Sequence, residues 1–340
     1  MHSVAISKYL CRLLSLAGVL ISTVAICAAM EPDRTAPPAN GPAVERSVRQ
    51  DLNNGHANDA IALLQENLSR NSANAADHEL LCRVYIEEEQ WTPAEQECNR
   101  AVELEPNNSR YHEWLGRAYG GAAAHASLTS AYSLAKKVHA EFEAAVRLDP
   151  TNESALSDLG EYLVDVPGML GGGTARAEEI AQQLQPLNAA RYHALQAKID
   201  AKQSDDSGAE QQWKLAIQTS SYPANEWMGL AEFYGDRKNF TAMEQAIQGG
   251  NAADRTSGPA LVRGATLLIV KHKDAAQAEE MLRKYLASHQ QSEEAPAFQV
   301  HVQLGKLLAA NGDKTDAANE FAAAHALASE YKAAQQAPRG

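Results

Sequence analysis

Apolar residues recur along this chain at the spacing of amphipathic helices, and short helices follow one another in blocks. The clearest block covers residues 75–108, where two apolar stripes fit helical periodicity: Leu81, Cys82 and Tyr85, then Ala94, Cys98 and Ala101. Pro106 follows the second stripe, where a proline ends a helix and begins the turn to the next block. Each block therefore predicts two short helices.

Small residues mark the period of these blocks, which is close to 34 residues. They stand at matching positions of successive blocks: Cys82, Gly116, Gly160, Ala197, Ala231, Ala265 and Gly305. In several blocks a second small residue follows twelve positions later: Ala94, Ala209 and Ala317. Small residues at these points let two helices approach closely, and a fixed period in this range indicates a stacked array of helix pairs.

This pattern resembles the tetratricopeptide repeat. That family has a Leu-Gly-like pair and an aromatic residue on the first helix, an alanine–aromatic–alanine pattern on the second, and a closing proline. The third block fits it well, with Leu115, Gly116 and Tyr119, then Phe142, Ala145 and Pro150. We count about eight units. The resemblance implies an all-α, right-handed superhelical solenoid over residues 45–332, and we expect 333–340 to be a flexible tail.

The first 29 residues have the pattern of an export signal. Lys8 and Arg12 precede an apolar run from Leu13 to Ala29 that ends in small residues suited to cleavage. An uncleaved membrane anchor and lipidation at Cys27 are the alternatives, although Ile26 is bulky for a lipoprotein box. Residues 30–44 are rich in Pro and Ala and are expected to be a linker. The interpretation places the protein in the periplasm or outside the cell.

Two segments depart from the regular repeat. The third unit has ten extra residues between Tyr119 and Val138, rich in Ala and Ser, which predicts longer helices. The fourth unit contains a glycine-rich segment over 166–173, which we interpret as a wide turn. A phosphate-binding loop would need a Lys before Thr174 and a preceding strand, and neither is present.

The chain is acidic, with 30 basic and 43 acidic residues and a net charge of −13. Loss of Lys8 and Arg12 with the signal leaves 28 basic residues and a charge of −15. This balance disfavours nucleic acid, whose binding uses clustered Lys and Arg, and it disfavours an anionic membrane surface. A membrane contact is expected only through an uncleaved N-terminus.

Residues with catalytic or metal-binding potential do not form known constellations. His78-Glu79 and His112-Glu113 begin like a zinc-protease helix, but Cys82 and Gly116 stand where the second histidine is needed. His78, His112 and His193 recur at one position of the first helix, where a half-buried packing role is expected. We therefore predict no enzyme activity, no metal and no cofactor.

The resemblance implies a concave groove lined by the first helices, whose exposed side chains contact a ligand. Carried onto this sequence, the groove positions are Glu79, Arg83, Arg110, Glu113, Arg117, Glu161, Arg191, Lys198 and Lys202. Arg83, Arg117, Lys198 and Lys306 are equivalent, and a basic stripe there favours an acidic or extended peptide. The alternative is that these cations pair with Glu79, Glu113 and Glu161 and bind nothing. A clamp for a C-terminal carboxylate is not expected, because it needs Lys and Asn where Glu79 and Glu113 stand.

Two cysteines remain after the signal, Cys82 and Cys98, one on each helix of the second unit. Disulfides persist in exported proteins, so a bridge between them and a pair of buried thiols are both open.

The sequence predicts a non-enzymatic scaffold that binds a peptide or protein in the cell envelope. The alternative is a structural subunit that self-associates through its helix ends or convex face. The oligomeric state is open.

Overall fold

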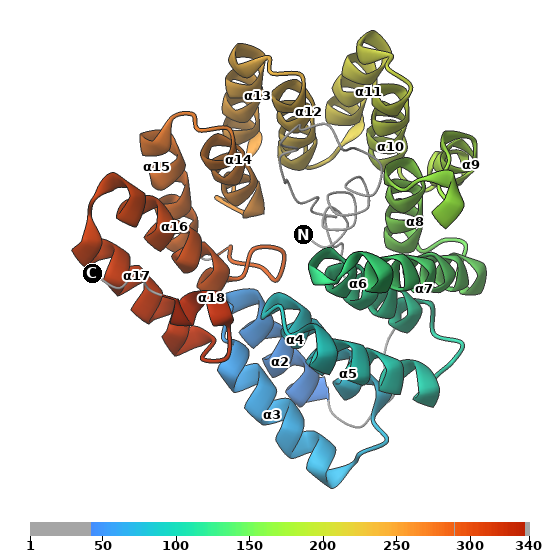
Figure 1. Cartoon of the computed structure of the whole chain (residues 1–340), viewed down its shortest axis with the longest axis vertical. Helices are drawn as coiled ribbons and strands as arrows, with labels where there is room; N and C mark the ends of the chain where they lie inside the picture. The colour runs from blue at the N-terminus through green and yellow to red at the C-terminus, as the bar shows by residue number, and fades with distance from the viewer. Residues whose placement is uncertain (1–41, 289, 337–340) are drawn as a thin grey trace. The chain divides into compact units, whose positions relative to one another are not determined.

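The structure, a computed structural model, describes residues 42–288 and 290–336 (Figure 1). This part of the chain consists of α-helices arranged as eight consecutive pairs, with one 3-10 turn and a short final helix. The eight pairs match the predicted units, and the all-α repeat fold is confirmed. The predicted signal, residues 1–29, and most of the predicted linker lie outside the described residues.

Contacts divide the chain into two compact units. The first contains the helices of residues 105–255: α6 (Ser109–His125), α7 (Leu128–Leu148), α8 (Glu153–Asp165), η2 (Gly168–Leu170), α9 (Thr174–Leu184), α10 (Ala189–Lys202), α11 (Asp206–Thr219), α12 (Ala224–Asp236) and α13 (Phe240–Ala253). Within it each helix packs against its pair partner, and α10 also packs against both helices of the preceding pair.

The second unit joins the beginning and the end of the repeat array (Figure 1). Its helices are α2 (Pro42–Asn54), α3 (Ala57–Arg70), α4 (Ala75–Glu87), α5 (Trp91–Leu104), α14 (Pro259–Val270), α15 (Ala275–Leu286), α16 (Ala297–Asn311), α17 (Lys314–Leu327) and α18 (Lys332–Gln335). One buried cluster draws on both ends, with Val48, Leu64 and Leu80 alongside Phe298, Phe321 and Tyr331. The first and last repeats therefore share a hydrophobic core.

Helix starts follow simple capping chemistry. Asparagine side chains accept a backbone N–H at the start of four first helices: Asn74, Asn108, Asn152 and Asn188. Aspartate or asparagine does the same for four second helices: Asp205, Asn239, Asp274 and Asp313. Each of these eight caps satisfies a donor that the helix leaves unpaired, so the polar residue before each of these helices sets its first turn.

Small residues lie where helices approach closely, as the period predicted. A Cβ on Gly116 would stand 2.5 Å from the Phe142 ring of the paired helix, and one on Gly160 would stand 2.3 Å from Leu195. Leu195 belongs to α10, the first helix of the next pair. The small positions therefore serve contacts between successive pairs as well as contacts inside one pair.

The extra residues of the third repeat, which consists of α6 and α7, lengthen both of its helices, as predicted. Helix α6 has 17 residues and α7 has 21, compared with 13 or 14 in several neighbouring helices. The added length of α7 lets this helix pack against the glycine-rich segment of the fourth repeat.

The glycine-rich segment is more ordered than a simple wide turn. It contains the 3-10 turn η2, whose Leu170 carbonyl lies 2.8 Å from the Tyr162 hydroxyl. The same hydroxyl lies 2.8 Å from the Ala135 carbonyl on α7. Gly171 has φ +91°, and a Cβ there would meet the His139 ring at 2.7 Å. The segment thus packs against α7.

Both edges of the predicted solenoid need correction. Helix α2 begins at Pro42, inside the segment expected as a linker. Helix α18 covers Lys332–Gln335, and Ala334 is buried in the shared core, so the folded part extends past the expected boundary at 332. Both helices contribute apolar residues, Val48 from α2 and Ala334 from α18, to the core that the two ends of the repeat array share.

Candidate functional site

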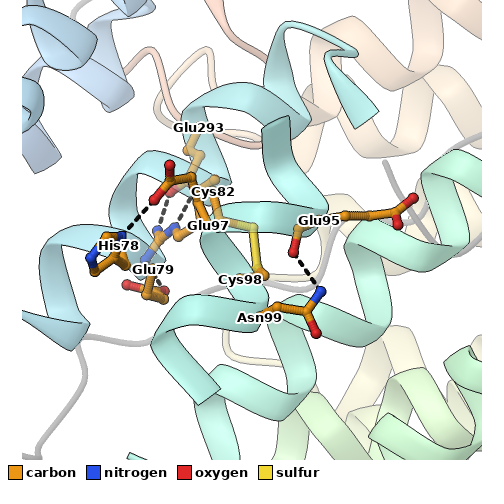
Figure 2. The surroundings of a disulfide bond; sticks show 9 residues. His78, Glu79, Cys82, Glu95, Glu97, Cys98, Asn99 and Glu293 are labelled. Carbon is orange, nitrogen blue, oxygen red and sulfur yellow. Dashed lines mark hydrogen bonds and ion pairs between the residues drawn. A yellow bond between two sulfur atoms is a disulfide. The ribbon is translucent and has the colours of Figure 1, made fainter. Parts of the chain in front are cut away.

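Arg83, on α4, is the centre of a buried charge cluster in the second unit. Its Nε donates to Glu293 Oε1 at 2.6 Å, its Nη2 donates to Glu293 Oε2, and its Nη1 donates to Glu79 at 3.2 Å. Figure 2 shows Glu79 and Glu293 close to the Cys82–Cys98 pair. Burial lowers the pKa of Arg83, but the two carboxylates outweigh it, so the net shift is upward and Arg83 stays charged.

Glu79 and Arg83 were expected to be exposed on a groove, and the structure corrects this. Each is only 1 % exposed, and Glu293 is 7 % exposed. The reason is that Glu293, in the segment between α15 and α16, covers the guanidinium. Sequence reasoning missed Glu293 because it lies 210 positions from Arg83 and outside the repeat positions.

A disulfide lies directly beside this cluster. The structure bonds Cys82 on α4 to Cys98 on α5, with Cα atoms 5.3 Å apart (Figure 2). Cys82 is fully buried and Cys98 is 1 % exposed. Cys82 and Cys98, the small residues of the second helix pair, are therefore joined across the same kind of contact between paired helices that Gly116 and Phe142 make in the third pair.

Arg117, on α6, holds a similar cluster in the first unit. It pairs with Glu113 at 2.8 Å on its own helix and with Asp158 at 2.7 Å on α8. Its Nη2 also donates to Ser154 Oγ at 2.7 Å, and its guanidinium lies over the Trp114 ring at 4.5 Å. Burial raises the pKa of Asp158, and Arg117 only partly offsets the effect. Sequence reasoning missed Asp158.

The row of charges continues from α8 to α10. Lys198 lies 2.6 Å from Glu161, and Arg191 lies 3.6 Å from Glu153. Lys202, near the end of α10, is exposed, and its Nζ is 3.5 Å from the carbonyl of Asp165. Burial raises the pKa of the Asp165 carboxyl to about 6. We call these charged side chains of α6, α8 and α10 the charged row: Arg110, Glu113, Arg117, Glu153, Asp158, Glu161, Asp165, Arg191, Lys198 and Lys202.

The structure thus brings the expected groove residues of the first unit into one row, but it also pairs them. Arg117 with Glu113 and Lys198 with Glu161 are pairs that the alternative interpretation foresaw. The side chains of Arg191 and Lys198 are 18 % and 20 % exposed, and Arg110 is half-buried. The Nζ atom of Lys198 is itself buried, so the accessible positive charge of the row comes from Arg110, Arg191 and Lys202.

The recurring histidines join the two helices of a pair. His78 contacts Glu97 at 2.5 Å, His112 contacts Glu141 at 2.6 Å, and His193 contacts Gln212 at 2.7 Å. His301 repeats the arrangement with Glu320 at 2.6 Å. These rings serve packing and helix pairing, which is the role expected of that position.

Two further features of the described residues concern metal binding and membrane crossing. No group of three or more His, Cys, Asp or Glu side chains in residues 42–288 and 290–336 is placed to hold a metal ion. In the same ranges, none of the helices combines the length and the apolar character that a membrane crossing requires.

Comparison with known proteins identifies the repeat. Residues 52–117 match the family model described as tetratricopeptide repeat. No curated protein matches the chain. Among solved structures, yeast Tom70 is similar with a TM-score of 0.54 and 16% identity, over 91% of this chain and 66% of that one. The thermophilic TPR protein TTC0263 of Thermus thermophilus has a TM-score of 0.47 and 16% identity, over 59% of this chain and 97% of that one. The small-residue period, the eight helix pairs and the matching family model agree: residues 52–117 form a tetratricopeptide repeat, and the other described helix pairs continue the same helix-pair fold.

Proposed function

We propose that this protein is a non-enzymatic interaction scaffold that binds a peptide or protein segment along the charged row of its first unit. The repeat fold supports a role in protein–protein interaction. The observation that carries the specific proposal is that three consecutive first helices place charged side chains in one connected row. Arg117 links α6 to α8, and Lys198 links α8 to α10.

The row suits an extended segment that presents carboxylates. Lys202 is exposed, and the guanidinium of Arg191 is held by Glu153 and by Ser157 Oγ at 3.2 Å. A guanidinium fixed in this way forms directed hydrogen bonds to a carboxylate with less loss of side-chain entropy. Deeper members such as Glu113, which is 5 % exposed, position their neighbours and do not contact the ligand.

The test uses a photo-crosslinking residue at Lys202, with the same residue at Lys214 as control. Lys214 is an exposed lysine on the second helix α11, where it pairs with Glu210. A partner is expected to crosslink from position 202 and not from 214. With that partner purified, Lys202→Glu combined with Arg191→Gln should weaken binding at least tenfold, whereas Lys214→Glu should change it less than twofold. If Lys214→Glu weakens binding as much as the Lys202→Glu and Arg191→Gln combination does, the proposal is refuted.

We propose that the protein works outside the cytoplasm, supported by the export-signal pattern of residues 1–29 and by the buried cysteine pair. The mass of the mature protein purified from a cell-envelope fraction tests this. Cleavage near residue 29 is expected, and an intact N-terminus recovered in the cytoplasm contradicts it.

Self-association through the helix ends has less support. The pairs at the two ends of the array, α2/α3 and α16/α17, already pack into a common core within one chain. A concentration-dependent mass in light scattering would restore that alternative.

A further inference from the structure

The segment between α15 and α16 contains a tight acidic turn over Ser292–Ala295. The Ala295 N–H donates to the Ser292 carbonyl at 3.0 Å, which closes the turn. The fully buried Tyr285 fixes it from below, because its hydroxyl donates to the Ala295 carbonyl at 2.7 Å and accepts from the Ser292 N–H at 2.9 Å. Glu293 and Glu294 occupy the two central positions of this turn.

The turn presents Glu293 to α4 in the way that a bound peptide presents a carboxylate. The guanidinium of Arg83 meets both Glu293 oxygens as a fork, and Glu79 accepts from the third nitrogen. A fork of this kind is directional and charge-assisted, and it is the usual way in which arginine recognises a carboxylate. Figure 2 shows Glu293 approaching α4 beside the disulfide.

Neighbouring contacts dock the same stretch of chain on the first repeats. Gln299, in the first turn of α16, donates to the Glu87 carbonyl at 2.6 Å at the end of α4. At Gly55, between α2 and α3, a Cβ would stand 2.6 Å from the Ala297 nitrogen, so only glycine permits this approach. The turn is therefore seated on a complementary surface of the first two repeats.

We infer that the Ser292–Ala295 turn is a built-in ligand of the α4 face, and that it closes this face to acidic peptides from other proteins. The position that the repeat period marks for ligand contact is occupied from within the chain. The α4 face accepts a short turn with a glutamate at its tip, and the charged row of the first unit is the surface left for an outside partner. This inference rests on the proposed function, since it assumes that first-helix faces bind protein segments.

The first experiment replaces residues 291–295 of the full chain with a Gly/Ser segment of equal length. The probe is a fluorescent peptide with the sequence of residues 290–297, and a second peptide carries Gln in place of the glutamate that corresponds to Glu293. The replaced chain should bind the first peptide at least tenfold more tightly than the natural chain does. Binding should fall back with the Gln peptide, and also when Arg83→Gln is added.

The inference is overturned if the natural and the replaced chain bind the peptide with equal affinity. It is also overturned if Arg83→Gln leaves the affinity of the replaced chain unchanged. Crosslinking from Lys202 should persist in the replaced chain, so loss of that signal alone counts against the proposed function and not against the built-in ligand. Circular dichroism tests whether the replaced chain keeps its helices.

If the replaced chain does not keep its helices, two single substitutions test the inference instead. Glu293→Gln should speed amide hydrogen exchange across residues 290–296 at least tenfold. The control Glu280→Gln, which changes an exposed glutamate of α15, should leave the exchange within twofold. Equal exchange in the two variants would show that the fork with Arg83 does not hold the turn.

Discussion

The Nδ1 atom of His112 lies 2.6 Å from Glu141 Oε2 on the paired helix, while Nε2 of the same ring lies 3.0 Å from the Pro106 carbonyl. Both partners can only accept hydrogen bonds, so both ring nitrogens are satisfied only in the protonated, charged form. His78 has the same geometry, with Glu97 at 2.5 Å and the Ser72 carbonyl at 3.1 Å. Two helix pairs are therefore joined by imidazolium–carboxylate contacts.

These contacts predict a loss of stability as the solution becomes alkaline. The hydrogen bond to Glu141 raises the pKa of His112 above 6.5, and Glu97 raises that of His78 although burial opposes it. A raised folded-state pKa stabilises the protein fully below about pH 6.5, and the gain disappears as pH rises through the folded-state pKa. Each contact should contribute about 1 kcal/mol. Urea unfolding between pH 5.5 and 8.5 measures the slope.

His112→Gln should flatten part of this slope, because glutamine keeps a hydrogen bond but does not titrate. The control is His193→Gln, since His193 faces the neutral Gln212. An unchanged slope in His112→Gln would contradict the assignment.

Glu88, at the end of α4, predicts a second pH effect of the same sign. It is 1 % exposed, and burial together with nearby Glu330 raises the pKa of its carboxyl to about 7 although Gln90 donates to it. The folded state therefore holds this proton more tightly, and stability falls as pH rises from about 4.5 through 7. Glu88→Gln should raise the free energy of unfolding at pH 8 by about 1–3 kcal/mol and change little at pH 4. The exposed Glu103→Gln should be neutral at both pH values in the same urea series.

Reduction of the Cys82–Cys98 bond should destabilise the second unit. The bond closes a loop of 16 residues, for which the loss of unfolded-state entropy corresponds to about 3 kcal/mol. The double variant Cys82→Ala with Cys98→Ala should show a similar fall in thermal stability without reductant. Reductant should then have no further effect on the variant. A natural chain that titrates two free thiols after unfolding would show that the bond is absent from the purified protein.

Gly116→Ala should destabilise the third helix pair, even though alanine is the better helix former by about 1 kcal/mol. The new Cβ would stand 2.5 Å from the Phe142 ring, which is 1 % exposed and cannot move freely. A net cost of about 1–3 kcal/mol is expected. Gly305→Ala is the matched control, because its closest contact would be 3.1 Å. In thermal unfolding, Gly116→Ala should have a lower midpoint temperature than Gly305→Ala. The opposite order would contradict this explanation of the packing.

Much of this fold follows from local patterns, and its exceptions follow from contacts between distant residues. Cys82 and Gly116 marked helix contacts correctly because small residues at a fixed period reflect repeated local packing. The burial of Arg83 could not be foreseen, since its partner Glu293 lies in an irregular segment 210 positions away. Periodicity shows which face of a helix a residue occupies, but it does not show which distant segment covers that face.

The core shared by Val48, Leu64, Phe298 and Phe321 has a consequence for how the chain folds. Neighbour-only contacts would let a repeat array form progressively from its N-terminus, but here α2–α4 lack part of their packing until α16 exists. At a synthesis rate of about 5–20 residues per second, this delay is on the order of 10–50 s. Contacts this distant in sequence also slow folding. During that interval the early repeats expose apolar surface, which makes the nascent chain a natural client for holding chaperones.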